Sequence, residues 1–194
     1  MEFQRYLAEL SSACKTDKFG LFEGASLAEI EECEAKLGFK IPLKLQNIYK
    51  VNNGQSVDRV PVFPLGHEFL PMNDMASIWM QQKDVKADSP DFPWQPNWIP
   101  FAQSIGGGLF CYCYTDSSNQ ISQFYADSED VRIFDCDIDE FLKKLASEIK
   151  SGKLVFDESL SILEWSEDKI WNKCGINRTP TSRINRTPTN ISRY

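Results

Sequence analysis

The single histidine, His67, is the first residue to weigh for catalytic chemistry. A Ser-His-Asp or Cys-His nucleophile system would have to use it as the general base. It lies between two expected short strands, and the chain has neither a nucleophile-elbow pattern nor a second histidine at zincin spacing. We interpret His67 as a surface or strand-end residue. The alternative is a hydrolase or transferase that uses it as a base.

The pair Cys111 and Cys113 is the strongest metal or redox pattern in the sequence. On a strand, alternation places both thiols on one face and Tyr112 and Tyr114 on the other. The chain lacks Cys-x-x-Cys and a second Cys or His pair at zinc-ligand spacing, so the pattern favours a buried strand. The run 106–108 of three glycines leads into a strand and indicates a hairpin turn rather than a phosphate loop. We expect no catalytic residue, metal or cofactor.

The charge pattern points to a protein partner. The chain has 28 acidic and 21 basic residues, a net charge of −7, and residues 61–140 carry 13 acids against three bases. Such a middle region repels phosphate and favours a basic protein surface, although a solvated acidic surface kept for solubility gives the same composition. We expect no direct nucleic-acid binding. The acids expected to contact a partner are Asp84, Asp88, Asp91, Asp127, Glu129, Asp130 and Asp135.

Two aromatic residues accompany these acids. Residues 87–97 hold three prolines and several polar or acidic residues, which predicts a surface loop. Phe92 and Trp94 lie in this loop and are therefore expected as exposed anchors for a partner. Trp98 begins an apolar run that predicts a buried strand, so we assign it to the core.

The elements expected to position these residues alternate between helical and strand patterns. Residues 2–14 are amphipathic, Ser26 and Glu29 form a capping-box pattern, and Pro42 suits the first turn of a short third helix. Asn73 is expected to cap a helix to about Val85, and Asp137 to cap another that ends before Gly152. Expected strands are 57–65, 69–70, 98–102, 109–115, 121–125 and 131–134.

Length and composition suit one globular domain. The chain has 194 residues and is 42% hydrophobic, and it contains no apolar run of the roughly 20 residues that span a bilayer. Its N-terminus lacks the pattern of a signal peptide, which predicts a cytoplasmic protein that does not bind membranes. We assign residues 1–175 to the domain.

Residues 176–194 are expected to form a flexible basic tail in which Ile-Asn-Arg-Thr-Pro-Thr occurs twice. This segment holds four arginines and no acid. It has three readings: an inert tail, a proline-directed phosphorylation site, or a segment that folds back onto the acidic middle.

Four blocks of the sequence, in order, resemble the SUKH superfamily, in particular the branch of bacterial immunity proteins and fungal regulators of cell-wall glucan synthesis. Together they span about residues 20–155. The blocks are the helix that leads to 38–42, the helix end at 49–54, the segment 98–102 with 107–114, and the strand and helix of 131–145.

The resemblance implies an α+β fold: a mixed, mostly antiparallel sheet with helices packed largely on one side. It also implies a binding protein without catalytic apparatus. Bacterial relatives commonly bind and neutralise a toxin domain such as a nuclease or deaminase. We therefore expect an immunity protein that meets a toxin domain through an acidic surface. The alternative is a regulatory scaffold in cell-wall synthesis or signalling.

Overall fold

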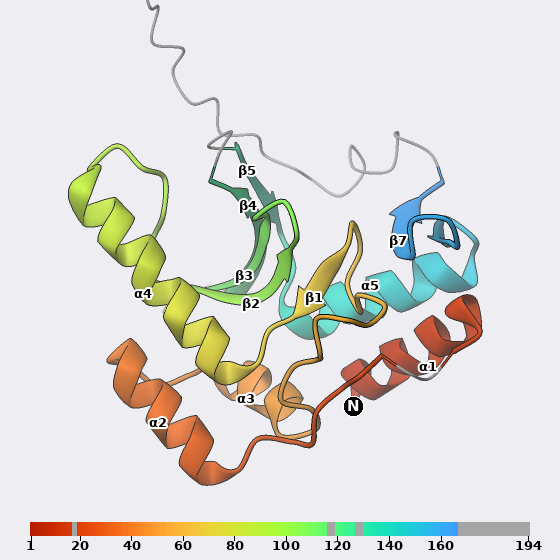
Figure 1. Cartoon of the computed structure of the whole chain (residues 1–194), viewed down its shortest axis with the longest axis horizontal. Helices are drawn as coiled ribbons and strands as arrows, with labels where there is room; N and C mark the ends of the chain where they lie inside the picture. Colours follow the sequence, from red (N-terminus) through yellow and green to blue (C-terminus); the bar gives the residue numbers. More distant parts are fainter. Residues whose placement is uncertain (17–18, 116–118, 127–129, 167–194) are drawn as a thin grey trace, which may run out of the picture.

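The fold is an antiparallel sheet with helices on one face and along one side (Figure 1). The computed structural model describes residues 1–16, 19–115, 119–126 and 130–166. The strands pair in chain order, and the expected α+β class is confirmed. They are β1 (His67–Phe69), β2 (Trp98–Ser104), β3 (Leu109–Tyr114), β4 (Asn119–Tyr125) and β5 (Asp130–Phe134).

The helices start and end largely where capping residues predict. Ser26 and Glu29 form the reciprocal capping box of α2 (Leu27–Leu37), and Gly38 ends it with a φ of 81°. The Asp137 side chain accepts a hydrogen bond from the Glu140 amide at the start of α5 (Ile138–Lys150). The remaining helices are α1 (Glu2–Cys14), α3 (Leu43–Tyr49) and α4 (Met72–Asp88).

The cap of α4 differs from the prediction. The helix begins at Met72, with Pro71 at the N-cap position, so Asn73 is inside it. The Met72 amide donates instead to Asn53 Oδ1, 3.0 Å away. A side chain 19 residues earlier therefore caps this helix.

The expected strand over 57–65 is also absent. Within the described residues, the first strand is β1, which covers only 67–69. Pro61 and Pro64 cannot donate to a strand ladder, and Leu65 and Gly66 have positive φ angles that turn the chain. The segment packs as an irregular loop whose Val62 and Phe63 are buried.

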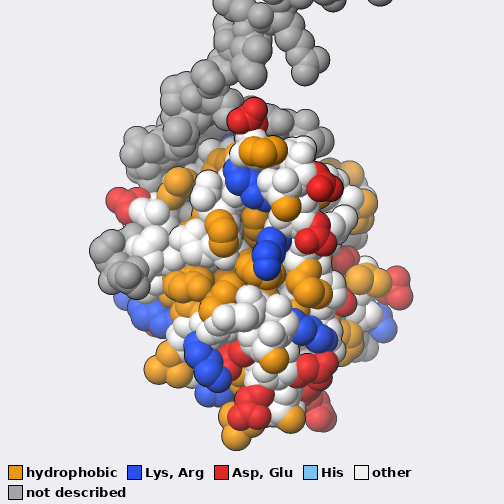
Figure 2. All heavy atoms as spheres, turned by 90° about the vertical axis from the view of Figure 1, so that its left-hand side faces the viewer, with side chains coloured by type: hydrophobic (Ala, Val, Ile, Leu, Met, Phe, Trp, Pro, Cys, Tyr) orange, Lys and Arg blue, Asp and Glu red, His pale blue; other side chains and the backbone are white. Residues whose placement is uncertain are grey.

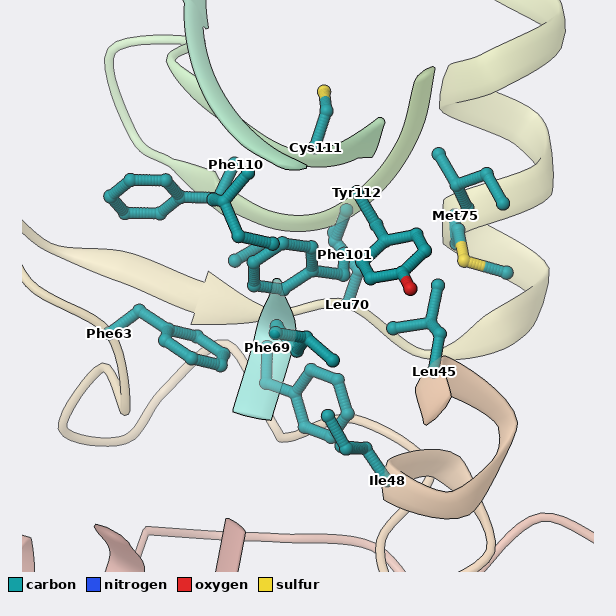
Figure 3. Packing of buried hydrophobic residues seen from close by; sticks show 14 of the residues in the cluster. Leu45, Ile48, Phe63, Phe69, Leu70, Met75, Phe101, Phe110, Cys111 and Tyr112 are labelled. Carbon is teal, nitrogen blue, oxygen red and sulfur yellow. The ribbon is translucent and has the colours of Figure 1, made fainter. Parts of the chain in front are cut away.

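An aromatic core lies between the sheet and the helices (Figure 3). Phe110 of β3 contacts Phe141 of α5, with ring centroids 5.5 Å apart, and Phe101 of β2, 6.2 Å apart. Helix α1 packs along α5, and its Phe3 meets Phe69 of β1. Helix α4 lies alongside β2 at the side of the sheet (Figure 1).

A second, smaller sheet follows α5. Strands β6 (Leu154–Asp157) and β7 (Ile162–Trp165) pair antiparallel, and β6 packs against α5. The Leu65 amide donates to the Leu163 carbonyl, 2.8 Å away, which joins this hairpin to the loop before β1. The domain therefore extends past residue 155, whereas 167–194, including the expected basic tail, lie outside the described residues.

Candidate interaction surface

Three of the predicted acids lie together at the end of α4. Asp84 and Asp88 are exposed and four residues apart, so they share one side of the helix. Exposed Asp91 follows in the next loop, 89–97. Lys86 Nζ donates to the carbonyls of Pro90 and Phe92, at 2.7 and 2.6 Å, which holds the loop around Asp91 against the helix. We call Asp84, Asp88 and Asp91 the α4 acids.

The surface around the α4 acids is mixed rather than uniformly acidic. Met80 and Val85 are 37% and 38% exposed, and Lys83 Nζ lies 5.1 Å from the centre of the Trp79 ring. Figure 2 shows hydrophobic, basic and acidic side chains interspersed over the side of the molecule that carries α2 and α4. Because apolar side chains sit among charges here, this face offers both contact area and electrostatic guidance.

Two of the other predicted acids, Asp130 and Asp135, lie at opposite ends of the sheet. Asp135 is exposed just after β5 and accepts a hydrogen bond from Gln120 Nε2 at 3.0 Å. Strand register places it at the end of the sheet where β2 begins, while Asp130 pairs with Tyr125 at the opposite end. Asp127 and Glu129 lie outside the described residues. Of the five predicted acids within the described residues, the structure therefore brings three together.

The prediction of Phe92 and Trp94 as exposed anchors is wrong. They are only 8% and 1% exposed, and their ring centroids lie 5.5 and 5.8 Å from that of Phe124 in β4. Trp94 also meets Trp98 at 5.7 Å. The physical cause is that Phe124 lies with Leu109 on the face of the sheet opposite to Phe110 and α5, and this apolar face must also be covered. The proline-rich loop supplies that cover.

His67 is fully buried in the core. Its Nδ1 lies 2.7 Å from the Pro64 carbonyl, and its ring centroid is 4.3 Å from that of Phe110. Burial lowers the histidine pKa from 6.5 to about 4, so the ring is neutral at physiological pH. The prediction of a strand-end position is confirmed, and that of a surface position is wrong.

The cysteine pair lies in a buried strand, as predicted. Figure 3 shows Cys111 and Tyr112 pointing to opposite sides of β3. Cys113 Sγ lies 3.1 Å from Ser122 Oγ, and burial raises the Cys113 pKa to about 12, which disfavours a reactive thiolate. Among the described residues, no group of three or more His, Cys, Asp or Glu side chains could hold a metal ion.

A groove between β1 and α4 escaped prediction. Glu68 points away from the core, opposite to its buried neighbours His67 and Phe69, and faces the groove together with Asp74 of α4. Strand alternation at 67–69 is the sequence signal that could have shown this orientation. The prediction of a strand over 57–65 gave no indication of the groove, because this segment in fact forms a loop in which Val57 lines the groove wall.

Comparison with known families identifies this architecture. The model of the SMI1 / KNR4 family (SUKH-1) matches residues 24–151, and the chain belongs to this family. A comparison with curated proteins found no match. Helix α1 and the β6–β7 hairpin lie outside the matched residues although both pack against α5 or its neighbours. Among the described helices, none is long and apolar enough to cross a membrane.

Proposed function

We propose that this protein is a cytoplasmic immunity protein that binds and neutralises a cognate toxin domain and catalyses no reaction itself. Membership of the SUKH-1 family supports a binding role, since bacterial relatives in the superfamily commonly neutralise toxins. The observation that carries the proposal is the surface at the end of α4, where three exposed acids accompany exposed Met80 and Val85.

The chemistry of this surface suits a basic partner such as a nuclease or deaminase domain. Carboxylates accelerate encounter with a positively charged cleft, and the effect falls with ionic strength. Exposed apolar side chains beside the carboxylates add affinity when they leave water. The buried Phe92 and Trp94 have a supporting role here, because they fix the loop that presents Asp91.

The test is co-expression with the product of a neighbouring toxin gene. The proposal expects restored growth and a complex that copurifies. Absence of both, with the protein folded, would contradict it. A protein that leaves growth impaired but binds a host regulator would instead fit the regulatory scaffold.

Charge reversal tests the surface. Asp84→Lys, Asp88→Lys and Asp91→Lys together should slow association at least about tenfold and flatten its dependence on salt. The matched control is Glu23→Lys, Glu140→Lys and Glu158→Lys, which makes the same change in net charge at exposed sites away from α2 and α4. Equal association rates for the two triple variants would exclude the α4 acids from the interface.

A further inference from the structure

The groove between β1 and α4 is an apolar hollow with acidic walls. Its volume is about 240 Å³, below the roughly 300–1,000 Å³ of typical small-molecule sites, so its size suits one or two side chains. Phe69, Leu70, Pro71 and Ile78 supply its apolar surface. Gln55, Val57, Glu68, Asp74, Ser77 and Gln103 complete the lining.

The negative charge of this groove is not neutralised from within. No lysine or arginine lines it, and within the described parts of the chain neither Glu68 nor Asp74 belongs to an ion pair. Partial burial and the nearby charge of Asp58 raise the pKa of Glu68. A positively charged side chain that entered the groove would relieve this repulsion between carboxylates. Apolar residues close to it in the same bound segment would cover the apolar surface of the groove.

We propose that this groove binds an arginine of the chain's own C-terminal segment, residues 176–194. The segment has three copies of an Ile-x-Arg pattern and no acidic residue. In an extended chain, residues two apart point to the same side. An Ile-x-Arg copy would therefore place its isoleucine on the apolar surface and its guanidinium against Glu68 or Asp74. The copies end at Arg178, Arg186 and Arg193.

The segment is long enough to reach the groove. The Leu65 amide bonds the Leu163 carbonyl, so the end of β7 lies beside the chain three residues before Glu68. Ser166 is three residues after Leu163, and Glu68 is three residues after Leu65. The path from Ser166 to Glu68 through this contact is therefore shorter than about 30 Å. Residues 167–176 can span about 33 Å when extended. Attachment in one chain also gives the arginines a high effective concentration at the groove.

Photo-cross-linking of the full chain tests the proposal. A benzophenone amino acid replaces Val57, 71% exposed at the groove wall, or, as a matched control, Leu43, 67% exposed at the start of α3. In low salt, we expect the probe at residue 57 to label peptides from 176–194 at least fivefold more than the probe at residue 43. The label should fall with added salt.

Two sets of substitutions separate charge recognition from chance contact. Glu68→Gln with Asp74→Asn, and separately Arg178→Gln with Arg186→Gln and Arg193→Gln, should each reduce the label at least fivefold without changing the thermal melting curve. Equal labelling from both probes, or labelling that survives the first pair, would overturn the proposal. Mixing isotopically light and heavy chains identifies cross-links between two copies, which would also overturn it. Toxin binding plays no part in this test, so its outcome is independent of the proposed function.

Discussion

Two irregular segments, 55–66 and 89–97, contribute buried side chains to the core by different means. In the first, the buried amide of Gln55 serves the backbone: its Oε1 accepts from Val62 and Phe69, and its Nε2 donates to Phe19 and Val60. In the second, the side chains of Phe92 and Trp94 cover the apolar face of the sheet around Phe124. Two side chains of α4 also donate to carbonyls of this loop: the buried Trp79 indole to Pro96, and the Lys86 ammonium group, at the exposed edge, to Pro90 and Phe92.

The two segments are therefore sensitive to the loss of different kinds of contact. Loss of a buried amide leaves several backbone groups without partners and without water, and each such group is costly. Loss of a polar contact at the exposed edge of a loop leaves carbonyls that can accept hydrogen bonds from water instead. For segment 89–97, most of the stabilisation should therefore come from its aromatic side chains.

The largest effect is expected for Trp94→Ala. Removal of a fully buried indole leaves a large cavity beside Trp98 and Phe124, and the free energy of unfolding should fall by about 3–5 kcal/mol. Trp94→Phe should cost clearly less because it keeps most of the apolar volume. Urea denaturation measures both. A cost below about 1 kcal/mol for the alanine variant would show that the loop does not contribute to the core.

Gln55→Leu should follow, with a loss of about 2–4 kcal/mol in the free energy of unfolding. The leucine keeps apolar bulk but leaves the amides of Val62 and Phe69 and the carbonyls of Phe19 and Val60 without their partner. Gln81→Leu, at an exposed position of α4, is the control and should change stability by less than about 0.5 kcal/mol. Similar values for both variants would refute the bridging role of Gln55.

His67, at the end of the first segment, should make stability depend on pH. Its pKa is about 4 in the folded protein against 6.5 for the free side chain, so between these values the unfolded chain binds more protons. Stability should therefore fall as the pH drops from 6.5 to 4, by up to roughly 3 kcal/mol from this group.

The contribution of His67 can be isolated with His67→Asn, whose amide can donate to the Pro64 carbonyl in place of Nδ1–H. Carboxylates with lowered pKa, such as Asp137 and Asp157, also reduce stability in acid and do so in both proteins. The difference between the two profiles of unfolding free energy against pH reports His67 alone. Parallel profiles from pH 7 to 4 would contradict the assignment.

Lys86→Met should have the smallest effect, about 1 kcal/mol, because Pro90 is exposed and water can replace the ammonium group at the carbonyls. Lys143→Met, at an exposed position of α5, serves as the control. Urea denaturation of both variants gives the comparison. A loss comparable to that of Gln55→Leu would mean that the Lys86 contacts stabilise segment 89–97 as strongly as the buried Gln55 amide stabilises segment 55–66.

Local signals sufficed for much of the fold. Ser26 with Glu29, and Asp137 with Glu140, carry their caps within four residues, and the helices begin where these pairs predict. The apolar runs of β2 and β3, and the shorter apolar segments of β4 and β5, likewise marked strands whose pairing follows chain order. These features depend on neighbours in sequence, so a single sequence displays them.

Features that depend on distant partners were missed. Asn73 has the right residue type for a cap, but its Oδ1 accepts from Lys36 Nζ while Asn53 caps the helix. The burial of Phe92 and Trp94 depends on Phe124 of β4, about 30 residues further along the chain. Acidic composition likewise predicted a surface but not its arrangement, because only the fold decides which acids become neighbours.

The hydrogen bonds on the outer side of β1 also bear on behaviour at high concentration. The His67 carbonyl accepts from Phe63, while the amide and carbonyl of Phe69 bind the Oε1 and backbone amide of Gln55. An unoccupied strand edge can recruit a strand from another molecule and start aggregation. Here the chain's own loop occupies the outer edge of β1. Gln55 therefore helps to prevent this edge from pairing with a strand of another molecule.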